Sequence, residues 1–120
     1  MAYGKCFLSG TYGIVERHHI FGGARRDLSE RYGLVVYLSP EKHQIDRDSA
    51  HRSGETADKL HRYGQRKAML ENDWTVEQFR LVFGKNYLDA DELAEIRAMQ
   101  EEQRIPRASR FMVLAGALPF

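Results

Sequence analysis

Apolar positions along the chain first follow the spacing of strands. Residues 12–20, "YGIVERHHI", lead into two histidines through β-branched side chains. Residues 34–38, "LVVYL", are continuously apolar, and Pro40 follows soon after. Both patterns are typical of short strands, because β-branched side chains favour extended backbone and proline ends a central strand. The polar stretches 22–33 and 41–54 predict irregular connections, each with room for one helical turn.

The second part of the chain has helical spacing. Residues 55–71 place apolar or small side chains at intervals of three and four, which predicts a helix. Thr75, with a glutamine three residues later, has the signature of a capping box and predicts a second helix that stops at Gly84. A similar start signal predicts a third helix over residues 89–103. Two strands followed by helices indicate the α+β class.

Length and composition suit one soluble domain. The 120 residues are 42% hydrophobic and 29% charged, as in ordinary globular proteins. We expect a core over about residues 6–71, a helical extension over 75–103 and an apolar C-terminal tail over 104–120. No apolar run reaches the roughly 18 residues of a membrane span, and no signal peptide is recognisable. The single cysteine excludes an internal disulfide, so we expect a cytoplasmic protein.

Charge is unevenly distributed, although the net charge is only +1. Residues 1–67 carry 12 Lys and Arg against 8 Asp and Glu, whereas residues 71–103 carry 3 against 9. A basic first half suits a polyanionic partner. On charge alone, an ordinary solvated surface explains this mild excess equally well.

Histidines are the candidate chemical groups, since four of the five lie within residues 18–51. Cleavage of a phosphodiester needs a base that takes a proton from water and a cation that stabilises the scissile phosphate. Neutral imidazole is a suitable base near pH 7, and other imidazoles bind divalent metals. Neighbours in a strand point to opposite faces, so His18 and His19 would reach different partners, one the metal and one the water. His43 and His51 could close the metal site from the other side.

Each of these side chains also has a plainer interpretation. Adjacent histidines occur in surface loops, but this pair follows a β-branched run and precedes two glycines, which favours a site. Asp46 and Asp48 are alternative oxygen ligands, although solvated carboxylates are the simpler interpretation. His61 falls within a predicted helix, where we expect it on the surface.

Taken together, "ERHHIFGG", "YGLVVYL", "PEKH" and "SAH" resemble an HNH endonuclease of the ββα-metal class, in particular the small phage and prophage proteins. The resemblance covers roughly residues 6–88. It implies a ββα-metal hairpin wrapped by several helices, one divalent ion (Mg²⁺, Mn²⁺, Ni²⁺ or Zn²⁺) and DNA as the partner. By that resemblance His19 is the general base, His18 and His43 are metal ligands, and His51 is a third ligand or a phosphate contact.

The sequence departs from the family pattern in two places. The family has an asparagine or histidine near the start of the second strand that braces the loop carrying the base, but Gly33 and Leu34 stand there, so the bracing role is unassigned. Many members also hold a structural zinc with two Cys-x-x-Cys pairs. The matching positions are Cys6, Ser9, Ser39 and Lys42. Because structural zinc needs four protein ligands, we expect none here. The hairpin would then be held by packing, through the C-terminal extension or a second copy in a homodimer.

The function expected is therefore a metal-dependent DNA endonuclease or nickase of phage or host DNA processing, in a bacterial cytoplasm. The alternative is a catalytically inactive HNH-fold protein that binds DNA or serves as a phage interaction protein. Basic side chains around the histidines are candidates for phosphate contacts or are simply solvated. They are Arg17, Arg25, Arg26, Lys42, Arg47 and Arg52.

Overall fold

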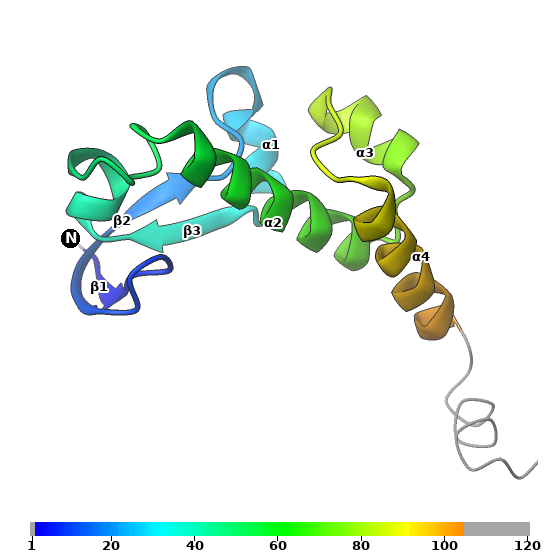
Figure 1. Ribbon diagram of the computed structural model, residues 1–120, viewed down its shortest axis with the longest axis horizontal. Helices are drawn as coiled ribbons and strands as arrows, with labels where there is room; N and C mark the ends of the chain where they lie inside the picture. The colour runs from blue at the N-terminus through cyan, green and yellow to red at the C-terminus, as the bar shows by residue number, and fades with distance from the viewer. Residues whose placement is uncertain (1, 105–120) are drawn as a thin grey trace, which may run out of the picture. The chain divides into compact units, whose positions relative to one another are not determined.

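The computed structural model describes residues 2–104 (Figure 1). Chain contacts divide the protein into two compact units, residues 1–87 and 88–120. The apolar tail expected over residues 104–120 lies outside the described residues from position 105 onward. Strands and most helices belong to the first unit, and the class is α+β.

An antiparallel sheet of three strands, in the order β1-β2-β3, forms one side of the first unit. The two predicted strands are confirmed as β2 (Tyr12–His19) and β3 (Val35–Leu38), with His18 opposite Val36. β1 (Ala2–Lys5) was not predicted. Its sequence, AYGK, has neither alternation nor a buried apolar side chain, so only pairing with β2 defines it as a strand.

The connection between β2 and β3 contains more helix than the sequence suggested. A 3₁₀ turn, η1 (Gly23–Arg25), runs directly into α1 (Arg26–Arg31). The strand pairing continues past β2 through a hydrogen bond of 3.0 Å from the Ile20 N–H to the Leu34 carbonyl. The connection therefore starts and ends on a defined strand ladder.

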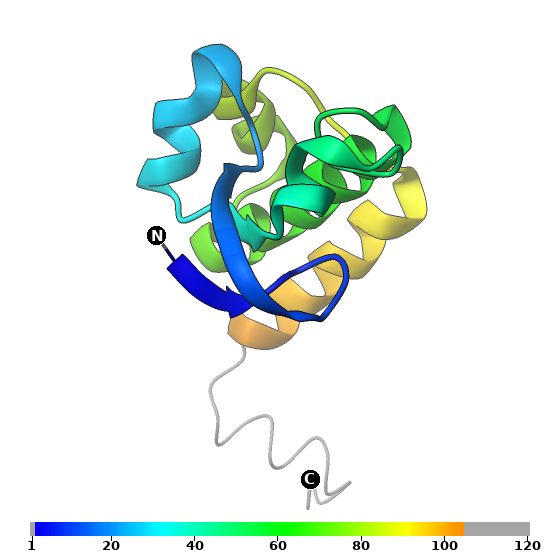
Figure 2. The same cartoon turned by 90° about the vertical axis from the view of Figure 1, so that its left-hand side faces the viewer.

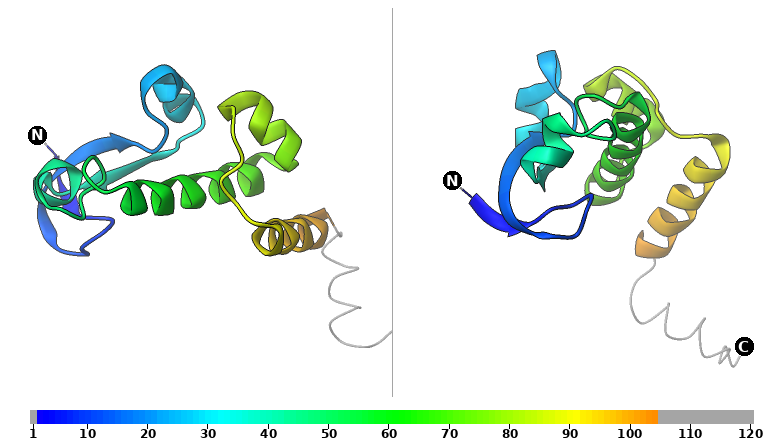
Figure 3. Two further views of the ribbon diagram at one scale, coloured as in Figure 1. Left: turned by 45° about the horizontal axis from the view of Figure 1, so that its top comes forward. Right: turned by 60° about the vertical axis from the view of Figure 1, so that its left-hand side comes forward.

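Two helical segments follow β3. A π-helical turn, η2 (Glu41–Ile45), precedes the long helix α2 (Gly54–Asn72). Both η2 and the start of α2 lie beside β2, as two views show (Figures 2 and 3). Gly64 sets how closely α2 approaches the sheet, because a Cβ there would lie only 2.7 Å from Ile20 and 2.9 Å from Phe21.

The remaining helices begin at the predicted residues. Thr75 and the side chain of Gln78 form a complete capping box at α3 (Val76–Phe83), and Gly84 ends this helix with a φ of 86°. In the second unit, α4 (Ala90–Arg104) starts after Asp89, whose carboxylate accepts the Glu92 N–H at 2.8 Å. Local capping chemistry therefore located these helix starts from sequence.

Candidate functional site

Three histidines from separate segments meet beside the sheet. His18 comes from β2, His43 from η2, and His51 from the loop before α2. One ring nitrogen of each can be chosen so that all three lie within 4.8 Å of one another. We call these three residues the histidine cluster. The sequence named all three as candidate ligands, and the structure brings them together.

Backbone geometry places His43 and His51 next to each other. The His43 N–H donates to the Ser39 carbonyl at 2.8 Å, which anchors the π-helical turn to the end of β3. The His51 N–H then donates to the His43 carbonyl at 3.1 Å. Single π-helical turns are rare and are often found at functional sites, since the wider turn redirects a side chain.

A chain of hydrogen bonds orders the rings. Nδ1 of His43 lies 3.0 Å from Oε1 of Glu16. Because a carboxylate only accepts, we assign the proton to Nδ1, and His43 Nε2 is then an acceptor. Nε2 of His51 lies 2.9 Å from that atom and donates to it. If a metal replaced this proton, it could bind Nε2 of His43 and Nε2 of His51, which lie 2.9 Å apart.

Burial disfavours the charged form of His18 and of His51. His18 and His43 are each 9% exposed, whereas His51 is exposed. Burial, followed by the neighbouring His43 and His51, lowers the pKa of His18 from 6.5 to about 4. Burial also lowers the pKa of His51. Neutral imidazoles have a free lone pair at neutral pH, so the cluster suits a cation that enters past His51.

His19, the last residue of β2, has a different neighbour. Its Nε2 lies 3.6 Å from Oε2 of Glu30 on α1, and its side chain is 12% exposed. This Nε2 is buried and has no hydrogen-bond partner among the described residues. Hydrogen bonds from Arg17 lower the pKa of Glu30, so the carboxylate stays ionised next to the imidazole. His18 and His19 thus have different neighbours, and their roles as metal ligand and base stay predictions.

Both sets of groups nevertheless open into one cavity of about 220 Å³, which we call the histidine hollow. The chain bends at Ile20, directly after His19, and the side chains of His18 and His19 both line this hollow. The side chains that matter in this hollow are His18, His19, His43, His51, Arg17 and Arg26. A candidate base, a candidate metal site and two cations therefore face one small volume.

The other basic candidates lie elsewhere. Lys42 pairs with Asp46 at 3.4 Å and with Asp48 at 2.8 Å, so these carboxylates do not join the histidine cluster. Arg52 donates to the Ile45 carbonyl at 2.6 Å. Arg47 is exposed and lines none of the cavities described for residues 2–104. Arg25 lines a second cavity instead of the histidine hollow.

Bracing of the loop after His19 comes from a residue that the sequence analysis did not find. The hydroxyl of Ser29, which is 0% exposed, accepts the Phe21 N–H at 3.0 Å and donates to the Phe21 carbonyl at 2.8 Å. Gly33 and Leu34 have no polar side chain, so neither could make these two hydrogen bonds. No sequence signal marks Ser29, whereas Glu16 stands two residues before His18 on one strand and the alternation could have found it.

The positions matching the family's zinc ligands also come together, with different chemistry. The Ser9 N–H lies 3.4 Å from the Cys6 sulfur, and the Lys42 N–H donates to the Ser39 hydroxyl at 3.2 Å. Burial raises the pKa of Cys6, but hydrogen bonds with Ser9 and Ser39 outweigh it, and the pKa falls to about 6. One thiol and two hydroxyls do not fit a structural zinc, so its expected absence stays a prediction.

Comparison with known proteins gives no relative: no family model, no curated protein and no solved structure matches the chain. No helix among residues 2–104 combines the length and apolar character of a membrane span.

Proposed function

We propose that the protein is a metal-dependent DNA endonuclease or nickase of the ββα-metal type. In this proposal β2 and β3 form the hairpin, and η2 with the following loop replaces the start of the helix that carries the remaining ligands. One observation carries the proposal: His19 and the histidine cluster face a single hollow that also contains two arginines. Base, metal ligands and phosphate-binding cations are the parts that phosphodiester hydrolysis requires.

The donor set favours particular metals. Three imidazole nitrogens suit Zn²⁺, Ni²⁺ or Cu²⁺ better than Mg²⁺, which prefers oxygen ligands and retains its water. Three protein ligands also leave coordination positions open, as catalytic sites do. When bound, such an ion would stabilise negative charge on the scissile phosphate and on its leaving oxygen.

His19 acts in this proposal through its two nitrogens. Nδ1 takes the proton from the attacking water, while Nε2, with its proton, faces Glu30 at 3.6 Å. The imidazolium that results lies beside an ionised carboxylate, which lowers the cost of the charge. Glu30 is thus a positioning residue for the base, and Arg17 holds it in place through two hydrogen bonds.

DNA would approach along the cationic rim of the hollow. Arg26 lines the hollow and is exposed, so it is available for a phosphate oxygen. Arg17 has a side chain 47% exposed and is already paired with Glu30, so we assign it to orientation rather than to DNA. Such contacts bind phosphate without reading sequence.

Supercoiled-plasmid nicking tests the proposal. The full chain is incubated with Zn²⁺, Ni²⁺, Mn²⁺, Mg²⁺ or EDTA, and His19→Ala is measured beside the wild type. We expect metal-dependent nicking that falls by at least about a hundredfold in His19→Ala, since general base catalysis contributes that much. The folding control is the Zn²⁺ affinity of His19→Ala, measured by calorimetry, which should equal that of the wild type. If the wild type binds Zn²⁺ but does not nick the plasmid with any of the four metals, the nuclease proposal is rejected in favour of the DNA-binding alternative.

A further inference from the structure

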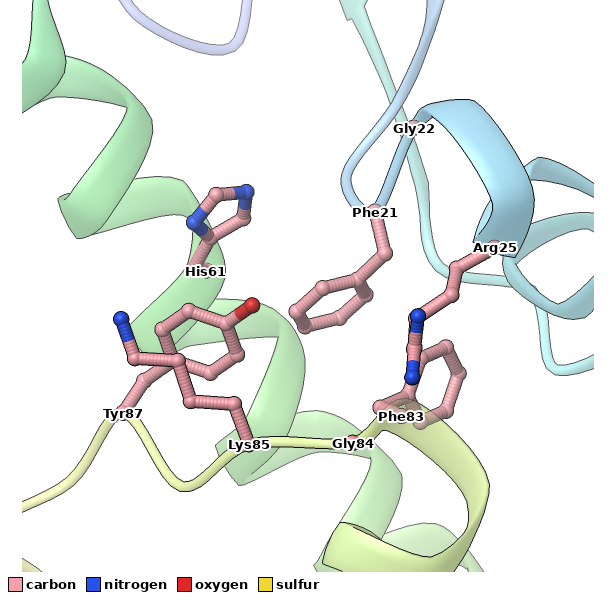
Figure 4. Close-up of a pocket in the computed structure, with 8 residues that line it drawn as sticks. All are labelled: Phe21, Gly22, Arg25, His61, Phe83, Gly84, Lys85 and Tyr87. Atoms are coloured by element: carbon pink, nitrogen blue, oxygen red, sulfur yellow. The ribbon is translucent and has the colours of Figure 1, made fainter.

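A second cavity in the first unit, of about 400 Å³, is lined by aromatic rings (Figure 4). We call it the aromatic hollow. Phe21 stacks on His61 with ring centroids 5.2 Å apart and planes inclined by 11°. Tyr87 lies 4.8 Å from His61 and 5.6 Å from Phe21. His61, expected on a helix surface, is therefore half-buried in an aromatic wall.

Two cations flank these rings. Figure 4 shows Arg25 on one side of the rings and Lys85 on the other. The Nε of Arg25 is buried without a hydrogen-bond partner among the described residues, and Nζ of Lys85 lies 5.1 Å above the ring of Tyr87. No carboxylate among residues 2–104 lines the cavity. Aromatic faces between unneutralised cations are the combination that binds a base together with its phosphate.

The segment carrying Lys85 and Tyr87 is fixed by a buried side chain. Gln65 on α2 is 0% exposed and accepts the Tyr87 N–H at 2.7 Å. Its amide nitrogen donates to Asn86 at 2.8 Å. On the other side the guanidinium of Arg25 lies against Gly84, where any Cβ would collide with it. These contacts preorganise the aromatic hollow without a ligand.

Gly22 lines both the aromatic and the histidine hollow, so the two are neighbours within one unit. We propose that the aromatic hollow binds an unpaired nucleotide of the DNA strand being cut, with its base on the aromatic wall and its phosphate on Arg25 or Lys85. The proposal rests on the proposed nuclease function and specifies its substrate. A base inside a duplex cannot stack on protein rings, so the enzyme would prefer single-stranded or locally unpaired DNA.

Binding without turnover tests the substrate assignment. A fluorescein-labelled oligo(dT) is titrated with the full chain in EDTA, and anisotropy gives Kd. We expect Tyr87→Ala to bind roughly tenfold more weakly, because loss of one stacked base costs that much, and Tyr87→Phe to bind like the wild type. Lys85→Gln should weaken binding and reduce its salt dependence, whereas Lys5→Gln, the same charge change at an exposed residue of β1, should do neither.

The outcomes separate the two proposals. Equal affinity of wild type and Tyr87→Ala for oligo(dT), with nicking by the wild type intact, would overturn the nucleotide pocket alone. Absence of any DNA binding or nicking by the wild type would overturn both. Free dTMP tests whether the pocket binds a nucleotide within a strand or a free nucleotide. If dTMP displaces the labelled oligo(dT) at an equal concentration of nucleotides, the strand-bound nucleotide is rejected. If dTMP does not displace it, the strand-bound nucleotide is supported.

Discussion

The carboxylate of Glu16 lies 3.0 Å from Nδ1 of His43, on the side of the ring opposite to the histidine cluster. Glu16 and His18 are two residues apart on β2, so one strand supplies both a candidate ligand and the group that orients another. A carboxylate that accepts the Nδ1 proton fixes the tautomer and makes Nε2 more basic. This arrangement predicts that Glu16 sets the metal affinity without touching the metal.

Replacement of this carboxylate should weaken metal binding. We expect Glu16→Gln to raise the Kd for Zn²⁺ by about 10- to 100-fold, as is typical when the acceptor behind a ligating histidine is lost. Isothermal titration calorimetry measures the effect directly. Glu41→Gln, the same change at an exposed position of η2, should leave Kd unaltered. If the Kd of Glu16→Gln for Zn²⁺ is unchanged, the Glu16 carboxylate does not influence metal binding.

Acid should destabilise the metal-free protein through His18. Burial and neighbouring histidines lower its pKa from 6.5 to about 4 in the fold, so the unfolded chain takes up this proton first as pH falls. The contribution is complete above pH 6.5 and is lost between there and pH 4. We expect a loss of about 3 kcal/mol in the free energy of unfolding over that range. Urea titrations in EDTA measure it.

The control for this prediction is His18→Gln, a neutral side chain that cannot take up the proton. Carboxylates also titrate in this range, and they contribute equally to both proteins. The difference in unfolding free energy between wild type and variant should therefore shrink as pH falls. Parallel curves would show that His18 is not buried as a neutral group.

Sequence reasoning worked best where a local rule decides the structure. The capping box at Thr75 and the stop at Gly84 depend on a few neighbouring residues, and both are observed. β2 and β3 follow from β-branched runs, and β3 is confirmed within one residue of its predicted start. The meeting of His18 with His43 and His51 was also anticipated, from spacing and resemblance, whereas their chemical roles stay predictions.

Long-range contacts could not be predicted in this way. β1 is a strand only because β2 offers it a partner, so its own residues carry no signal. Ser29 and Glu30 reach the base-carrying segment from α1, and a polar residue in an apparently irregular stretch looks the same whether buried or exposed. The aromatic hollow unites residues more than sixty positions apart, such as Phe21 and Tyr87.

Removal of the Ser29 hydroxyl should loosen the loop after His19. In Ser29→Ala both backbone groups of Phe21 lose their partner in a fully buried place, which costs about 1–3 kcal/mol for each unsatisfied group. We expect a fall of that order in unfolding free energy by urea denaturation. Thr11→Ala is the control, because it removes a hydroxyl that bonds to Ser9 on the exposed surface and should cost little. Equal stability of Ser29→Ala and the wild type would refute the brace.

Glu30 should govern the base but not the metal. In Glu30→Gln the imidazolium of His19 would form beside a neutral amide instead of a carboxylate 3.6 Å away, so its formation costs more. We expect the nicking rate with saturating metal to fall by about tenfold and its acid limb to shift to lower pH, because loss of the neighbouring carboxylate disfavours the charged form of the His19 ring. A pH profile decides between two causes: an acid limb at lower pH means lost charge stabilisation, and an unmoved limb with a lower plateau means lost orientation. In both cases the Zn²⁺ affinity of Glu30→Gln should equal that of the wild type. If the nicking rate also equals that of the wild type, Glu30 has no role in the reaction.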